Sequence, residues 1–93
     1  MNRLAWLYAK KEVKLDLGVE LIKKALEVQP NRAGYIDTLS ELYYVQGKII
    51  EAVKKIREAI NLNPDDPYYK QQLWRFKNVT PKILQAPNNK LDS

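Results

Sequence analysis

Asp37 and Glu41 are the side chains of this sequence best placed for acid and base chemistry. Four residues apart, they fall on one face of a helix, where two carboxylates can exchange protons or bind a cation weakly. The sequence has no histidine and no cysteine, so it lacks the commonest base near neutral pH, the strongest nucleophile and the soft ligands of zinc. No nucleophile accompanies the two carboxylates. We therefore expect a chain that is not an enzyme and binds no cofactor or metal.

Basic residues near two tryptophans point to nucleic acid as a partner. The net charge of +5 divides into +3 over residues 1–34, −2 over residues 35–66 and +4 over residues 67–93. Basic side chains attract phosphates, and tryptophan stacks on bases. The middle of the chain is acidic, however, and no repeated set of base-reading residues is visible, so RNA binding ranks behind the interpretations below. The residues concerned are Lys10, Lys11, Lys14, Lys23, Lys24 and Arg75, with Trp6 and Trp74.

Helices must position all of these side chains, because apolar residues recur at helical spacing. Gly47 is predicted to end one helix in a left-handed conformation, and Pro64 to close the next. Asp16 is predicted to cap a helix near the N-terminus. The central segment is therefore predicted to be a hairpin of two antiparallel helices. Its apolar positions are Ile36, Leu39, Leu42 and Tyr43 in the first helix, and Ile49, Val53, Ile56 and Ile60 in the second.

A similar hairpin is predicted earlier in the chain, because the sequence aligns with itself at an offset of 34 residues, or 35 for the first helix. The extra residue falls in a predicted turn between positions 10 and 14, where an insertion costs little. The matched positions are apolar or small, as expected where stacked helices approach most closely. The pairs include Pro30 and Pro64, Ala25 and Ala59, Ile22 and Ile56, Gly18 and Ala52, Leu4 and Leu39, and Ala5 and Ser40.

The pattern resembles the tetratricopeptide repeat. In YIDTLSELYYVQGKIIEAVKKIREAINLNP, residues 35–64, the family's usual positions are held by Ser40, Tyr43, Gly47, Ala52, Ile56, Ala59 and Pro64. Ile36 stands where the family usually has tryptophan. The resemblance covers residues 2 to about 78 and implies an all-α fold, in which helical hairpins stack into a short right-handed superhelix, an α-solenoid. The copies span about 2–32 and 33–66.

The two ends of this stack are expected to differ. Residues 67–78 are predicted to form a capping helix that begins at Pro67, after Asp65 and Asp66. Residues 79–93 are predicted to be a mostly disordered tail, or else to place Lys82, Ile83 and Leu84 in a groove of the same or a neighbouring molecule. The first copy has nothing stacked before it, so we expect its apolar face to be covered by further repeats or by a second chain.

The resemblance also implies a function, since the first helix of each hairpin in this family lines a concave groove for partner peptides. Trp6 and Tyr44 then serve either as aromatic anchors for the partner or as aromatic residues at the edge of the core. Because Asp37 and Glu41 are acidic, the groove should prefer a basic or neutral segment. The lining positions are Arg3, Trp6, Lys10, Asp37, Thr38, Glu41, Tyr44, Gln71 and Arg75.

We therefore predict a protein–protein interaction module that displays this groove to a peptide or protein. The alternative is a structural domain for homo-oligomerisation, assembled through stacked or exchanged repeats. No stretch is apolar and long enough for a membrane span or a signal peptide, which predicts a cytoplasmic protein without a membrane partner.

Overall fold

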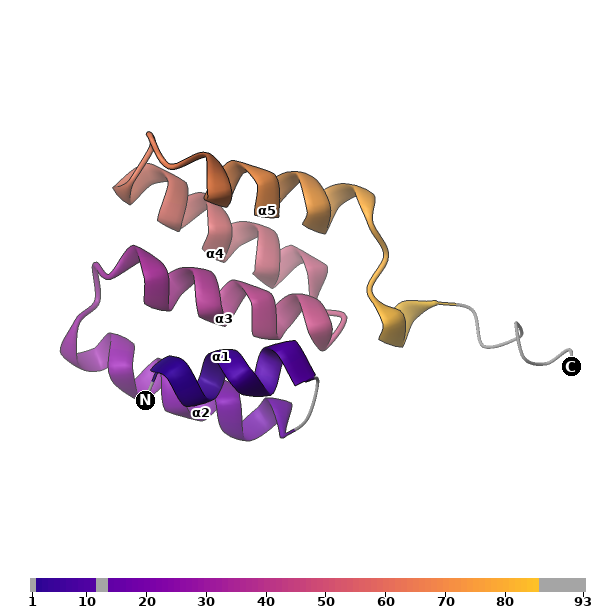
Figure 1. The fold of residues 1–93 in the computed structure, drawn as a ribbon, viewed down its shortest axis with the longest axis horizontal. Helices are drawn as coiled ribbons and strands as arrows, with labels where there is room; N and C mark the ends of the chain where they lie inside the picture. Colours follow the sequence, from indigo (N-terminus) through magenta and orange to yellow (C-terminus); the bar gives the residue numbers. More distant parts are fainter. Residues whose placement is uncertain (1, 12–13, 86–93) are drawn as a thin grey trace, which may run out of the picture.

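Five α-helices and one short 3-10 helix form the part of the chain that the structure describes (Figure 1). The computed structural model describes residues 2–11 and 14–85, with the backbone alone for residues 2 and 8–11. No β-strand occurs within these ranges, so the predicted all-α class is confirmed. The elements are α1 (Asn2–Lys11), α2 (Leu15–Val28), α3 (Ala33–Val45), α4 (Ile49–Leu62), α5 (Pro67–Asn78) and η1 (Lys82–Leu84).

Each helix packs against the next one along the chain, and α1 also packs against α3. Short connections join the helices, so consecutive helices run in opposite directions across the molecule (Figure 1). None of the described helices has the length and apolar character that a membrane span requires. The predicted packing of adjacent helices is therefore present.

The ends of three helices follow the predicted signals. Gly47 has φ 84°, its N–H donates to the Tyr44 carbonyl at 2.9 Å, and the Lys48 N–H donates to the Tyr43 carbonyl at 2.8 Å. These two bonds are the pair that ends a helix at a left-handed glycine. Helix α4 ends two residues before Pro64, as predicted. Asp66 precedes α5 and accepts a bond from the Tyr68 N–H at 3.0 Å, so the expected cap is also present.

The predicted cap at Asp16 is wrong. Helix α2 begins at Leu15, after Lys14, which has φ 50°, and Asp16 already lies inside the first turn. Its carboxylate accepts a hydrogen bond from Gln46 Nε2 at 2.8 Å instead. A negative charge in the first turn still favours the helix through the helix dipole, without capping its N–H groups.

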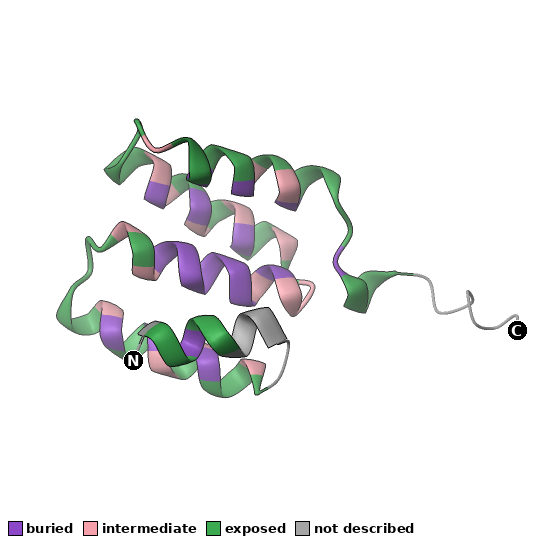
Figure 2. Ribbon diagram, in the orientation of Figure 1, coloured by how far each residue is buried: buried purple, intermediate pink, exposed green. Residues whose placement is uncertain are grey.

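The core consists of two clusters that share α3, the helix with the longest buried stretch in Figure 2. Eight residues of α3 are buried, although only some of them are apolar. Ser40 is completely buried and donates its hydroxyl to the Asp37 carbonyl at 2.6 Å, which satisfies the side chain within the helix. One cluster contains Ala5, Ile22, Ala25, Leu39 and Leu42, and the other contains Ile36, Tyr44, Ala52, Ile56, Ala59, Tyr69 and Phe76.

The segment predicted as a mostly disordered tail begins directly after α5. Residues 79–85 have a defined conformation that includes η1, and Pro81 is buried. Residues 86–93 lie outside the described residues. The near part of the tail therefore belongs to the folded molecule.

Candidate interaction site

Four polar side chains join α3 to α5, and we call them the α3–α5 polar cluster: Asp37, Glu41, Gln72 and Arg75. Asp37 and Glu41 lie one turn apart on α3, as their spacing predicts. Gln72 Nε2 donates to Asp37 Oδ1 at 3.2 Å and to Glu41 Oε1 at 3.1 Å. The two carboxylates therefore bind the same amide from the neighbouring helix.

Arg75 completes the cluster with the stronger bonds. Its Nη2 donates to both carboxylate oxygens of Glu41 at 2.7 Å, and its Nη1 donates to Gln72 Oε1 at 3.1 Å. The guanidinium carbon lies 4.6 Å from the centre of the Tyr44 ring, and that ring stacks on Phe76 with 4.8 Å between centres. The flat guanidinium is thus held between a carboxylate and an aromatic face, an arrangement that arginine suits better than lysine.

Burial raises the pKa of Asp37 to about 6, against an ordinary value of 3.8. The Gln72 amide opposes this shift by donating to the carboxylate, while the charge of Glu41 adds to it. Burial also raises the pKa of Tyr68 to about 12, and the charges of Asp37 and Glu41 contribute. Asp37 therefore gains a proton at a pH where an exposed aspartate stays ionised.

The cluster can fasten two helices together, but its chemistry offers little else. Both carboxylates already accept bonds from Gln72 or Arg75, and residues 2–11 and 14–85 hold no group of three or more side chains suited to a metal ion. The Glu41 charge is balanced by Arg75, so this part of the predicted groove is less acidic than the sequence suggests. Asp37 remains as the nearby carboxylate without an arginine bonded to it.

The structure places the nine predicted lining residues in three kinds of environment. Arg3, Trp6 and Gln71 are exposed, while Arg75 is half-buried. The side chain of Lys10 lies outside what the structure describes. Their binding of a partner stays a prediction. The buried members are Asp37, Thr38, Glu41 and Tyr44.

The contacts between α3 and α5 bring together four of the predicted residues: Asp37, Glu41, Tyr44 and Arg75. Tyr44 packs on Phe76 and donates its hydroxyl to the Val79 carbonyl at 2.7 Å. The alternative in which Tyr44 is an aromatic residue at the edge of the core therefore describes its position.

Gln72 is the member of the cluster that the sequence reasoning missed. The prediction used Gln71, which lies 34 residues after Asp37 and is exposed. Gln72 lies 34 residues after Thr38, and both of these side chains are buried. A signal was therefore present in the same alignment, one position further along.

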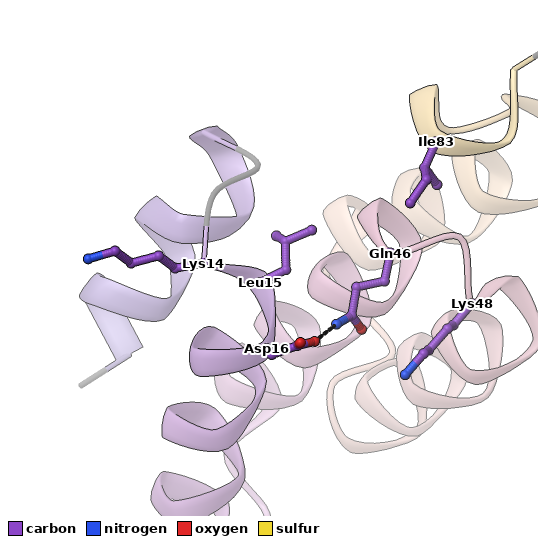
Figure 3. Close-up of a pocket in the computed structure, with 6 residues that line it drawn as sticks. All are labelled: Lys14, Leu15, Asp16, Gln46, Lys48 and Ile83. Carbon is purple, nitrogen blue, oxygen red and sulfur yellow. Dashed lines mark hydrogen bonds between the residues drawn. The ribbon is translucent and has the colours of Figure 1, made fainter. Parts of the chain in front are cut away.

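A second group of polar side chains lies at the end of the molecule where the turns meet. A cavity of about 430 Å³ opens between the start of α2, the turn between α3 and α4, and η1 (Figure 3). The bond between Gln46 and Asp16 lies within its wall. Its lining residues are Lys14, Leu15, Asp16, Gln46, Lys48 and Ile83.

A comparison of the sequence with protein-family models finds no match, and a search of curated proteins finds no match either. Function therefore has to be inferred from the residues and their geometry.

Proposed function

We propose that this chain is a tetratricopeptide-like interaction module of the cytoplasm, a short right-handed stack of helical hairpins without enzymatic activity. Helices α1, α3 and α5 are the first helices of successive copies and line a groove for a peptide or protein. The observation that carries this proposal is the burial of corresponding residues in successive copies. No such correspondence is expected of an unrelated helical bundle.

The matched pairs come from different helices but have the same environment. Ala5 and Ser40 are both buried without exposed surface, and so are Ile22 and Ile56. These pairs include small side chains, which allow helices to approach closely, as stacked hairpins require. The packing of α1 on α3, two helices further along, also fits a stack in which first helices lie side by side.

The proposed groove offers one aromatic contact at its N-terminal side. Trp6 exposes 41% of its surface on α1, beside exposed Arg3. Tryptophan and arginine are enriched among the residues that dominate binding energy. Asp37 contributes one acidic group and Arg3 one basic group, and Glu41 is paired with Arg75. This balance supports a neutral or weakly basic partner segment with an apolar side chain for Trp6.

Selection from a random peptide library tests the proposal. The bound peptides should lose about tenfold or more in affinity for a Trp6→Ala variant, measured by fluorescence anisotropy. Trp74→Ala is the matched control, because Trp74 is an exposed tryptophan of α5 outside the proposed lining. Failure to enrich any peptide, or equal losses for both variants, would contradict the groove.

The second candidate is homo-oligomerisation through the N-terminal face, by which we mean Leu4, Leu7 and Leu17. All three leucines are exposed on α1 and α2, and Leu4 exposes 44% of its surface. Clustered apolar side chains at the end of a repeat stack usually need a cover. This observation supports a second copy of the chain as the partner.

A further inference from the structure

The segment after α5 returns to the molecule and lies at the end of the helices, near the turn between α3 and α4 (Figure 1). Its first contact is the hydrogen bond from the Tyr44 hydroxyl to the Val79 carbonyl, which joins residues 35 positions apart. Pro81 is buried. Residues 79–85, which we call the latch, therefore make tertiary contacts rather than simply extending from α5.

Gly47 forms the floor beneath the latch. A β-carbon placed on Gly47 would lie 3.0 Å from Ile83 Cγ2 and 3.2 Å from Leu84 Cδ2, closer than such carbons normally approach. The glycine therefore has two uses here, since its positive φ ends α3 and its missing side chain makes room for two aliphatic residues. Tyr44 is fixed beside it by its stack on Phe76.

The latch is seated loosely, although its contacts are specific. A cavity of about 200 Å³ lies between it and the helices, with Ile49 and Phe76 on one side and Pro81 and Leu84 among the residues on the other. Ile83 is also one wall of the larger cavity in Figure 3. Ile83 and Leu84 expose 62% and 52% of their surfaces. A segment with this much exposed apolar surface can leave its seat without opening the core.

The latch keeps its shape through its own bonds. Val79 and Pro81 are extended, and η1 follows, with the Leu84 N–H donating to the Pro81 carbonyl at 3.0 Å. The Gln85 N–H donates to the Lys82 carbonyl at 3.1 Å. Proline restricts the backbone before this turn. Such a segment carries much of its bound conformation in its own sequence, which lowers the entropy cost of binding.

We propose that Tyr44, Gly47, Ile49 and Phe76 form a peptide-binding site that the latch occupies within the same molecule, and that a segment of the same chemistry from another chain displaces it. Such a segment offers a backbone carbonyl to Tyr44, then a proline and two adjacent aliphatic side chains. This site is separate from the groove proposed above and does not depend on it. Tethering gives the latch a high effective concentration, so a competitor must bind more tightly or be abundant.

A peptide with the sequence of Asn78–Gln85, labelled with a fluorophore, tests the proposal on the full chain. The double variant Ile83→Asp/Leu84→Asp releases the latch, because both side chains lie over Gly47 and are already half-exposed. We expect this variant to bind the peptide at least about tenfold more tightly than the unaltered chain, in which the tethered latch competes. Val28→Asp/Leu62→Asp is the matched control, since it alters exposed aliphatic residues elsewhere and should behave as the unaltered chain.

A third variant tests the contact with Tyr44. Tyr44→Phe keeps the ring that stacks on Phe76 and removes only the hydroxyl donor, so circular dichroism should show an unchanged helix content. Added to the released variant, it should weaken peptide binding several-fold. No binding of the peptide to the released variant would overturn the proposal. Equal binding to the released and the unaltered chain would also overturn it, because the latch would then not occupy the site.

Discussion

Asp37 loses most of its hydration in the fold and lies one helical turn from a second carboxylate, Glu41. Burial raises its pKa from 3.8 to about 6, so the folded chain binds this proton more tightly than the unfolded chain does. Protonation therefore stabilises the fold. The contribution of Asp37 to the free energy of unfolding should increase as the pH falls from about 7 to about 4, by at most about 3 kcal/mol, and should be constant above that range.

Urea unfolding of the unaltered chain and of Asp37→Asn, at pH 7.5 and pH 5, isolates this effect from the other carboxylates. Asparagine keeps an oxygen that can accept the bond from Gln72 but has no proton to gain. We expect the variant to be the more stable protein at pH 7.5 and to lose most of that advantage at pH 5. A constant difference between the two proteins at both pH values would show that Asp37 has an ordinary pKa.

Arg75 should stabilise the fold through the charge of Glu41. The Glu41 carboxylate is mostly buried and receives two bonds of 2.7 Å from this guanidinium. Arg75→Met keeps the apolar stem near Tyr44 but leaves the carboxylate without its cation, which should cost about 2 kcal/mol of unfolding free energy. Adding Glu41→Gln to this variant should recover more than half of the loss. Additive effects in the double-mutant cycle would argue against coupling between the two side chains.

Helix α3 contains one glycine and is followed by another, and the same substitution should have opposite effects at the two positions. Gly34 lies in the first turn of α3, and a β-carbon there would meet no atom within 4 Å. Gly34→Ala should therefore stabilise the chain by about 0.5 kcal/mol, because alanine has less backbone freedom to lose on folding. Gly47→Ala should destabilise it by about 1 to 2 kcal/mol, since φ is 84° and Ile83 lies over the site. Thermal unfolding measures both, and a change of the same sign in both variants would contradict this account.

The helices themselves could be predicted because their boundaries depend on neighbouring residues. Gly47, Pro64 and the pair Asp66 and Pro67 act through backbone conformation and local hydrogen bonds, which one short stretch of sequence specifies. Asp16 was wrongly predicted as a cap because its partner, Gln46, is 30 residues away. A long-range partner of this kind leaves no local signal.

The α3–α5 polar cluster was only half predicted, because sequence alignment gives a position on a helix but not which neighbour it faces. Asp37 is directed toward α5, where it meets Gln72. Its equivalent, Gln71, belongs to α5 itself and is exposed, since no described helix follows on that side. Thr38 and Gln72 are buried equivalents. The direction of each side chain became clear only once the order of the helices in space was known.

Helix α3 determines how the whole molecule holds together, since residues from it enter both clusters of the core. Leu39 and Leu42 pack with residues of α1 and α2, while Ile36 and Tyr44 pack with residues of α4 and α5. Neither half of the described chain can therefore lose its packing without affecting this helix. The stack should unfold as one cooperative unit, although stacks of repeats can also unfold in steps.

The N-terminal face decides between the two proposed functions at the level of the whole molecule. Leu4 and Leu7 are exposed on α1, and burying such side chains against a second copy is favourable by about 25 cal/mol for each square ångström of apolar surface covered. If homo-oligomerisation is the function, the mass measured by analytical ultracentrifugation should rise between about 10 and about 300 micromolar, because association depends on concentration.

The double variant Leu4→Glu/Leu7→Glu should then remain a monomer over that range, because it places charges where the second copy would pack. Val28→Glu is the matched control, since Val28 is an exposed aliphatic residue at the far end of α2 and should leave the association unchanged. A constant monomer mass for the unaltered chain, or equal association of both variants, would remove the second candidate. The groove along α1, α3 and α5 would then carry the proposed function alone, and Trp6 would be its first residue to test.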